Sequence, residues 1–405
     1  MSIFDAAGLG LLALRGWVRL TGDVLKGSTR YALPYKAHQF CEPKTMTRLI
    51  NRYSLLDDIN SVNISTILRQ DIPSISSNCQ NLVLTLDQDG VTKLPPSVFV
   101  KLPMESLLTR WFFSVINAWP LESYFFRHVA QHIPLRTPVT YATHWQGSRF
   151  FLIQENLHAD PQVELFVNPD MMTGPPMDVV YRALNTFAKL HAHHYGLGED
   201  EREAILPLKY HPFLSPGMGR VSRILNRLAL APCIRKRPNE IPQDIVNAYT
   251  ASVRHWDLLL EHWFSGPLSL LHGDSHLGNF FISGDDMGML DWQAAHWGKG
   301  IRDVQYFLID SLPADTLATH ERDLVNYYIE RRAHYGTAID PETTWQEYRC
   351  FTFHTLMTIV VSIGFGALNK EQDALMLELL RRSVAAVQRV DYAGWLQSFL
   401  AKRER

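Results

Sequence analysis

The sequence has few cysteines and no cysteine pair at short spacing. Its four cysteines lie far apart and form neither a C-x-x-C motif nor a zinc-ligand spacing. They are Cys41, Cys79, Cys233 and Cys350. This distribution argues against a disulfide-stapled scaffold and indicates free thiols in a reducing compartment, so we expect a cytoplasmic protein.

An excess of one charge is also absent. The 405 residues include 39 Lys and Arg against 41 Asp and Glu, which gives a formal net charge of -2. With both signs interspersed, such a chain has no strong electrostatic field, which argues against a nucleic-acid partner. Because 46% of the residues are hydrophobic, a disordered chain is excluded. We expect a soluble protein whose partner is a small molecule.

Long apolar runs are rare. Residues 6–14 form a poor signal peptide, because Asp5 precedes them and no basic segment does. The uncharged run 350–369 contains a histidine, several threonines and glycines, which favours a buried helix over a membrane span. For residues 11–25 we expect a helix packed on the small lobe, with membrane contact through this N-terminal segment as the alternative.

Hydrophobic periodicity divides the chain into two regions. Residues 64–157 are rich in strand patterns and the residues from 178 onward in helical ones, which predicts an α+β fold. In the first region we expect strands at 81–86, 97–102, 139–143 and 150–154, a turn at 87–90 and a helix at 121–132. In the second we expect helices near 180–190, 245–264, 316–335 and 345–368, a strand at 268–271 and a hairpin of 280–282 with 287–290.

The candidate catalytic and metal-binding residues cluster around this hairpin. An Asp (Asp274) is followed five residues later by Asn279, and Asp291 follows the next strands. Phosphoryl-transfer enzymes use this arrangement in their catalytic loop. Asp274 is the candidate catalytic base, and Asn279 and Asp291 offer the oxygen ligands that Mg²⁺ prefers. The alternative is a polar loop in which these side chains only form turns.

Phosphoryl transfer of this kind also needs a lysine on a strand and a glutamate on the following helix. Lys101 ends the apolar stretch 97–101, and strand alternation places it on the face of Ser97 and Phe99. Glu122 lies three, four and seven residues before apolar positions of its helix, on a stripe where an unpaired carboxylate would be costly. We therefore expect Lys101 and Glu122 to pair, the alternative being an exposed glutamate at a helix start.

The segment His272-Gly273-Asp274 with Asn279, followed by Asp291-Trp292-Gln293, resembles the aminoglycoside phosphotransferase and choline/ecdysteroid kinase-like families of small-molecule kinases. The resemblance implies ATP and Mg²⁺ as cofactors and a small-molecule hydroxyl as acceptor. It also implies a two-lobed, protein-kinase-like fold. Residues 1–60 would form a helical extension, and residues 61–157 a β-rich, ATP-binding N-lobe with one main helix. Residues 158–405 would form a larger, mostly helical C-lobe. His272, Arg302 and Asp303 would support the catalytic loop.

Two further assignments follow from the resemblance. The linker near Glu155 and Leu157 would bind adenine, although Glu155 can equally be an ordinary polar residue at a strand end. The loop 74–79, in which Ser76 and Ser77 would contact phosphates, contains no glycine. Glycine eases the approach of backbone to phosphate. A nucleotide-binding pseudoenzyme or regulatory module is therefore the alternative function.

Overall fold

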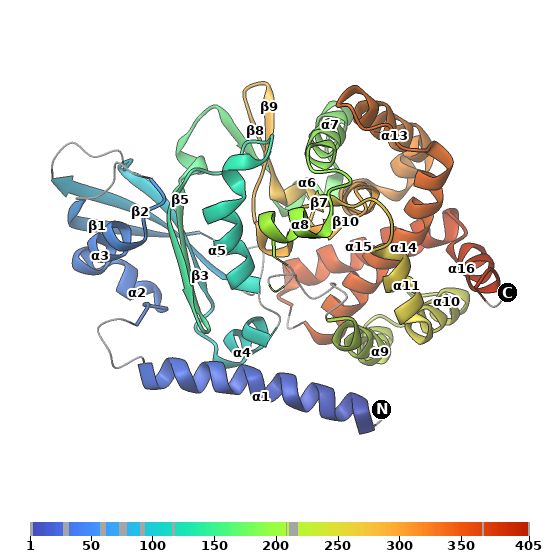
Figure 1. Ribbon diagram of the computed structural model, residues 1–405, viewed down its shortest axis with the longest axis horizontal. Helices are drawn as coiled ribbons and strands as arrows, with labels where there is room; N and C mark the ends of the chain where they lie inside the picture. Colours follow the sequence, from blue (N-terminus) through green and yellow to red (C-terminus); the bar gives the residue numbers. More distant parts are fainter. Residues whose placement is uncertain are drawn as a thin grey trace. The chain divides into compact units, whose positions relative to one another are not determined.

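The computed structural model of the chain describes residues 3–26, 32–56, 62–72, 79–89, 94–115, 118–207, 209, 218–366 and 368–403. The chain divides into two compact units, whose elements Figure 1 traces. The first takes in the described residues of Met1–Leu165, Ile205–Pro212 and Ile282–Ala294. The second takes in those of Phe166–Ala204, Phe213–Phe281 and Ala295–Arg405.

The first unit is built on an antiparallel five-stranded sheet with the order β1-β2-β3-β5-β4. Its strands are β1 (Asn63–Ile72), β2 (Cys79–Asp89), β3 (Ser97–Pro103), β4 (Thr140–Gln146) and β5 (Arg149–Glu155). In β3, Val98, Val100 and Leu102 belong to the hydrophobic core. Since strand residues alternate between faces, Lys101 lies on the opposite face, as predicted.

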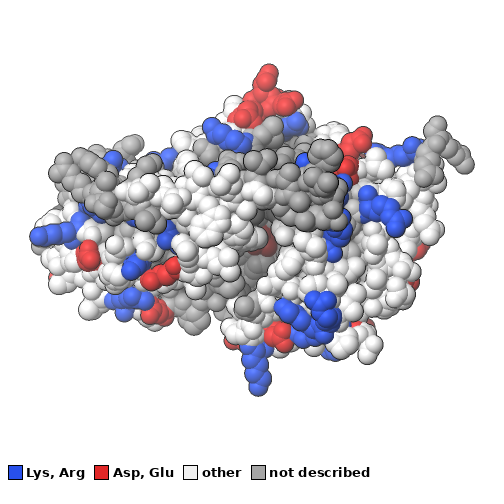
Figure 2. Space-filling view, turned by 90° about the horizontal axis from the view of Figure 1, so that it is seen from below, with Lys and Arg blue, Asp and Glu red and all other residues white. Residues whose placement is uncertain are grey.

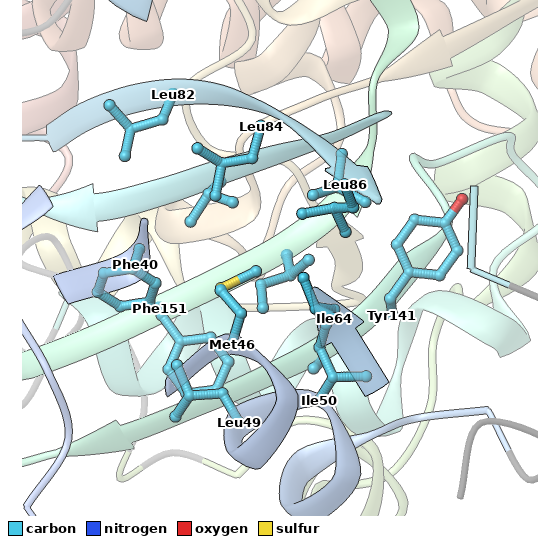
Figure 3. Packing of buried hydrophobic residues seen from close by; sticks show 14 of the residues in the cluster. Phe40, Met46, Leu49, Ile50, Ile64, Leu82, Leu84, Leu86, Tyr141 and Phe151 are labelled. Carbon is cyan, nitrogen blue, oxygen red and sulfur yellow. The ribbon is translucent and has the colours of Figure 1, made fainter. Parts of the chain in front are cut away.

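Two short helices cover the core face of this sheet. They are α2 (Ala37–Phe40) and α3 (Pro43–Tyr53). Figure 3 shows Phe40, Met46 and Leu49 packed with Leu84 of β2 and Phe151 of β5. The segment 1–60, which the sequence assigned to a helical extension, therefore supplies part of the core of the sheet unit. Burial of these apolar side chains is the main force that holds the helices to the sheet.

The other helices of the first unit are α1 (Ile3–Lys26), α4 (Leu107–Val115) and α5 (Ala118–His128), followed by a 3₁₀ turn at Ala130–His132. Helix α1 packs on α4, which confirms the predicted packing of the N-terminal helix. Helix α5 packs on β4 and β5, and its Glu122 reaches Lys101 of β3. It therefore lies on the face opposite α2 and α3.

A second, three-stranded sheet has the order β6-β8-β9, with β6 at Val163–Leu165, β8 at Phe280–Ser283 and β9 at Asp286–Met289. The strands β8 and β9 form the predicted hairpin, and Gly284 takes the positive φ of 62° that its tight turn needs. The chain passes from the second unit into the first within β8.

The second unit is mostly helical. Its helices are α6 (Asn168–Thr173), α7 (Met177–His193), α8 (Glu199–Ile205), α9 (Gly219–Lys236), α10 (Gln243–Arg254), α11 (Trp256–Trp263), α12 (Ile301–Ser311), α13 (Ala314–His334), α14 (Pro341–Phe365), α15 (Lys370–Arg389) and α16 (Tyr392–Ala401). A two-stranded antiparallel sheet joins β7 (Ser269–Leu271) to β10 (His296–Gly298). The α+β prediction, with the sheet first and the helices after it, is confirmed.

Among the described residues, α14 is the one helix long and apolar enough to cross a membrane. Most of its apolar stretch is buried, in contact with α9, α12 and α15. The prediction of a core helix for this part of the chain is confirmed.

Three local predictions were wrong. The expected turn at 87–90 is wrong for its described part, because Asp87–Asp89 continue β2 and pair with β1 across a bulge between Ile64 and Thr66. The helix expected at 245–264 is two helices, since it breaks at His255. Helix α5 ends at His128, four residues before the predicted end, and a 3₁₀ turn follows. Polar residues in a strand and a change of helix direction leave no clear mark in hydrophobic periodicity.

Candidate active site

The first set of candidate residues meets at the buried amino group of Lys101. Its Nζ lies 2.9 Å from Glu122 Oε1. Both residues are buried, with 6% of Lys101 and 1% of Glu122 exposed. The predicted pairing is confirmed. Lys101 is fixed by the buried strand β3, and Glu122 by the stripe of α5 that also buries Phe125 and Phe126.

Asp291 completes this set. Its Oδ1 lies 2.8 Å from Lys101 Nζ, and about a quarter of its side chain is exposed. The residue follows β9 and takes a left-handed backbone conformation with φ of 53°, which Asp tolerates better than most residues. Behind it, Trp292 is fully buried and stacks on Phe125 of α5, with ring centroids 4.2 Å apart. The stacked rings therefore anchor Asp291 to the helix that carries Glu122.

Burial and charge act against each other in this trio. Burial alone would lower the pKa of Lys101, but the carboxylates of Asp291 and Glu122 raise it above its ordinary value. Burial raises the pKa of Glu122, although Lys101 opposes that shift. One cation thus faces two carboxyl groups, and Glu122 Oε2 is buried without a hydrogen-bond partner. A second cation would be electrostatically favoured near Asp291, the more exposed of the two acids.

The second set of candidate residues lies on the loop that follows β7. Its backbone is held by Asp303 of α12, which accepts hydrogen bonds from the main-chain N–H groups of His272 and Gly273 at 2.7 and 2.9 Å. The ring of His191 on α7 lies 3.2 Å from the same carboxylate. Burial alone would raise the pKa of Asp303, but these contacts lower it to about 2. Asp303 is therefore a charged, buried anchor of the loop.

His272 and Arg302 differ in what they support. The ring of His272 is buried beneath the loop, and its Nδ1 accepts a hydrogen bond from the main-chain N–H of Asp274 at 3.3 Å. Arg302 instead donates to the Nε2 atoms of His296 and His354 at 2.6 and 2.8 Å. The His272 ring thus contacts the loop itself, whereas the Arg302 guanidinium contacts β10, α14 and the ring of Trp263. Loop support by the two residues stays a prediction.

Asp274 and Asn279 come together within this loop. The Asn279 side-chain amide donates to the main-chain oxygen of Asp274 at 2.6 Å, and the Asp274 side chain is 30% exposed. Since Nδ2 of Asn279 is engaged, its Oδ1 is the atom left to accept a hydrogen bond or bind a cation. The Asp274 carboxylate is thus held at the end of a fixed loop and remains open to a reactant.

The sequence analysis missed two residues next to Asp274. The hydroxyl of Tyr306 on α12 donates to Asp274 Oδ1 at 3.4 Å. One helical turn later lies Asp310, which is 2% exposed and has no hydrogen-bond partner for its Oδ1. Burial is the main cause that raises the pKa of Asp310 to about 8, and the negative charge of Asp274 acts in the same direction. Spacing could have revealed both, because Asp303, Tyr306 and Asp310 recur at three and seven residues on one helix face.

The remaining candidates are Ser76, Ser77, Glu155 and Leu157. Ser76 and Ser77 lie outside the described residues. The carboxylate of Glu155 accepts from Arg136 at 2.6 Å and from the main-chain N–H of Val139 at 2.9 Å, so it serves the end of β5. Leu157 is buried in the 3₁₀ turn that follows. An adenine-binding role of this linker stays a prediction.

The residues fit Mg²⁺ by the chemistry of their donors. Asp291 offers a partly exposed carboxylate beside the Lys101–Glu122 pair, and Asn279 offers an amide oxygen. Mg²⁺ commonly takes one or two such protein ligands and completes its shell with water and phosphate oxygens. The described residues contain no cluster of three or more His, Cys, Asp or Glu side chains that could hold a metal alone.

Comparison with known proteins identifies the family. The family model of the ecdysteroid kinase-like proteins matches residues 117–335, which is more than half of the chain. The chain belongs to the ecdysteroid kinase-like family. The match includes Glu122, the loop from His272 to Asn279, Asp291 and Asp303, so most of the site described above lies inside the segment that defines an ecdysteroid kinase-like protein.

Three solved structures resemble this ecdysteroid kinase-like chain. A putative aminoglycoside phosphotransferase from Ralstonia eutropha is 12% identical with a TM-score of 0.49, covering 86% of this chain and 98% of its own. A choline/ethanolamine kinase family protein from Mesorhizobium loti is 14% identical with a TM-score of 0.49 and coverages of 82% and 92%. Choline kinase from Cryptosporidium parvum is 13% identical with a TM-score of 0.47 and coverages of 89% and 97%.

No curated protein sequence matches the chain. The assignment to the ecdysteroid kinase-like family therefore rests on the family-model match alone, and the resemblance inferred from the catalytic loop is confirmed by it.

Proposed function

We propose that this protein is an ATP- and Mg²⁺-dependent phosphotransferase that transfers a phosphoryl group to a hydroxyl of a small molecule. The observation that carries the proposal is the buried trio of Lys101, Glu122 and Asp291, in a member of a kinase-like family. A lysine held between two acids has little role in stabilising a fold, because desolvation offsets most of the gain from a buried ion pair. It suits a site that must bind phosphate charge.

Each residue of the trio has a task in this proposal. Lys101, held by Glu122, would bind phosphate oxygens of ATP through a charge-assisted contact. Asp291 and Asn279 would hold Mg²⁺, and the bound metal would neutralise charge that develops on the phosphates. Asp291 would then exchange its contact with Lys101 for the metal, and Lys101 would be released toward the nucleotide.

Asp274 would act on the acceptor. Its carboxylate would orient the acceptor hydroxyl and take its proton as the bond between phosphorus and the acceptor oxygen forms and the bond to ADP breaks. Asp303, through the main-chain contacts that it makes, would keep the loop in the geometry that this step requires. Catalysis would consist mainly of positioning and charge stabilisation.

The acceptor belongs to the range that kinases of this kind use, namely an aminoglycoside, a choline-like amine, a sterol or a sugar. The near-neutral net charge supports a small-molecule acceptor and no nucleic-acid partner. The separated cysteines, three of them buried, support a cytoplasmic location.

The test is phosphoryl transfer from radiolabelled ATP with Mg²⁺, using one acceptor of each class. We expect a labelled product with the wild type and at least about a hundredfold lower rate with Asp274→Asn, since a positioned base contributes about 10²–10⁴-fold. Asp257→Asn, at an exposed surface acid of the same unit, is the matched control and should leave the rate unchanged.

The second candidate function is a nucleotide-binding pseudoenzyme, which the glycine-free loop 74–79 favours. It predicts Mg²⁺-dependent ATP binding with neither transfer nor hydrolysis for any acceptor. Transfer that survives in Asp274→Asn would contradict the assigned mechanism, and absence of both binding and transfer would contradict both functions.

A further inference from the structure

The carboxyl group of Asp310 is a buried acid that has no role in the mechanism proposed above. The residue lies in the last turn of α12, is 2% exposed, and has no hydrogen-bond partner for its Oδ1. A buried carboxylate with an unpaired oxygen is costly, whereas a protonated acid loses much less on burial. The last turn of a helix also disfavours a negative charge, because its carbonyl oxygens form the negative end of the helix dipole.

The groups that act on Asp310 come from three elements. They are Asp274 on the loop after β7, Tyr306 one turn earlier on α12, and Arg382 on α15. The guanidinium of Arg382 donates to the main-chain oxygen of Asp310, to two main-chain oxygens of α6 and to the carboxylate of Glu378. Because this cation is engaged by other acceptors, burial and Asp274 prevail, and Asp310 holds a proton at neutral pH with a pKa of about 8.

The remaining surroundings do not oppose this protonation. From α14, the ring of His354 packs on the Tyr306 ring with centroids 5.5 Å apart, and burial keeps its pKa well below the ordinary value. The other elements packed on α12, namely α6, α7 and α13, bring no further charged group of the described residues to Asp310. Acidic and basic side chains are both scattered over the face in Figure 2, and the net charge is only -2. Near neighbours therefore set the protonation of Asp310.

The hydroxyl of Tyr306 connects Asp310 with the candidate base Asp274. It donates to Asp274 Oδ1 at 3.4 Å. Burial is the main cause that raises the pKa of Tyr306 well above its ordinary value, and both acids act in the same direction by charge and by hydrogen bonding. A tyrosine hydroxyl carries one proton and two lone pairs. It can therefore donate to Asp274 while it accepts from protonated Asp310, but it cannot donate fully to two carboxylates at once.

We propose that Asp310 is a positioning residue of the phosphoryl-transfer site, which in its protonated form donates to the Tyr306 hydroxyl and keeps that hydroxyl directed at Asp274. The Asp274 carboxylate is then held in one orientation toward the acceptor. Loss of the Asp310 proton would turn the Tyr306 hydroxyl toward the new carboxylate and leave Asp274 without its donor. The inference rests on the proposed function, and it adds a switch that lowers transfer as pH rises above about 8.

The test measures transfer from radiolabelled ATP to an aminoglycoside, choline, a sterol and a sugar, between about pH 6 and 10. The wild-type turnover number should fall above about pH 8. Asp310→Ala should lower the turnover number at pH 7 about fivefold or more, the effect of one lost hydrogen bond, with little change in KM. Asp310→Asn should restore most of this loss, because its amide donates as the protonated acid does. Its turnover number should show no fall above pH 8, since the amide does not titrate.

Two further proteins isolate the route of the effect. In a Tyr306→Phe background, Asp310→Ala should change the turnover number by less than about twofold, because the hydroxyl that transmits the effect is already absent. Glu378→Gln is the matched control, since it removes an acid that contacts Arg382 and leaves the Tyr306 hydroxyl in place. Its turnover number and pH profile should equal those of the wild type.

Stability gives a readout that needs no activity. Because the folded-state pKa of Asp310 is raised, the native protein must keep a proton that the unfolded chain releases, and it loses stability as pH rises from about 4 to about 8. The urea midpoint of Asp310→Asn should therefore rise relative to that of the wild type over this range. A difference between the two midpoints that does not change with pH would overturn the proposal.

The outcomes separate this inference from the proposed function. An active wild type whose turnover number Asp310→Ala leaves unchanged would overturn the inference alone. A fall above pH 8 that persists in Asp310→Asn would do the same. Absence of transfer by the wild type with all four acceptors would contradict the proposed function, and the inference would fall with it.

Discussion

Replacing Asp303 by asparagine should loosen the loop that carries Asp274. The native carboxylate accepts two main-chain N–H groups and contacts His191, and these contacts lower its pKa from 3.8 to about 2. A shift of this size corresponds to about 2–3 kcal/mol of stability at neutral pH. Asparagine has nearly the same shape but no charge, so Asp303→Asn should be destabilised by about that amount.

The pH dependence gives the prediction its sign. Because the folded-state pKa is depressed, the stabilisation is present above the ordinary pKa near 4 and is lost as pH falls toward 2. By pH 3 the wild type should have lost about 1 kcal/mol of this advantage over Asp303→Asn. Urea unfolding of both proteins at pH 7, 5, 4 and 3 measures the difference between them.

Local hydrogen exchange provides the second readout. Amides of the peptide containing His272 and Gly273 should exchange faster in Asp303→Asn, because they lose a charged acceptor. Asp257→Asn, at an exposed acid paired with Arg223, is the control and should change stability by less than about 0.5 kcal/mol. The reasoning is refuted if the two variants are equally stable, or if the stability difference between Asp303→Asn and the wild type is the same at pH 5 and pH 3.

Three further changes test other contacts. Trp292→Ala removes the fully buried ring stacked on Phe125 and should destabilise the protein by about 3–5 kcal/mol in urea unfolding, and a loss below 1 kcal/mol would contradict the anchoring role. Tyr306→Phe should lower the turnover number with little change in KM, because it removes a hydrogen-bond donor to the Asp274 carboxylate; an unchanged turnover number would exclude this role. Glu155→Ala should weaken the first unit by about 1–3 kcal/mol, yet leave ATP affinity within about twofold in equilibrium binding, because its carboxylate serves structural contacts; a tenfold loss of affinity would assign it to the nucleotide.

The positions of Lys101 and Glu122 could be predicted because each follows from the repeat of apolar residues along its own strand or helix. Strand alternation placed Lys101 opposite the buried valines, and the helical stripe of α5 placed Glu122 where it needs a cationic partner. The hairpin that precedes Asp291 was visible as two short apolar runs around Gly284-Asp285-Asp286.

Other features depend on contacts between distant segments, which no local pattern encodes. The ion pair of Asp291 with Lys101 arises because Trp292 stacks on Phe125, more than 160 residues earlier in the chain. The strand β7 was predicted from the apolar run 268–271, but its partner β10 was not, because the sequence His-Trp-Gly of β10 forms no such run. The segment 1–60 looked like an appendage, although α2 and α3 complete the sheet core.

The central claim is that Asp291 binds the metal that accompanies ATP. Isothermal titration calorimetry with ATP, with and without Mg²⁺, tests it on the wild type, on Asp291→Asn and on Asp286→Asn, an exposed acid of the same hairpin. We predict Mg²⁺-dependent binding to the wild type and to Asp286→Asn, and at least a tenfold loss of affinity, or no Mg²⁺ dependence, for Asp291→Asn. Absence of ATP binding in all three proteins, or Mg²⁺-dependent binding that Asp291→Asn retains in full, would contradict the account.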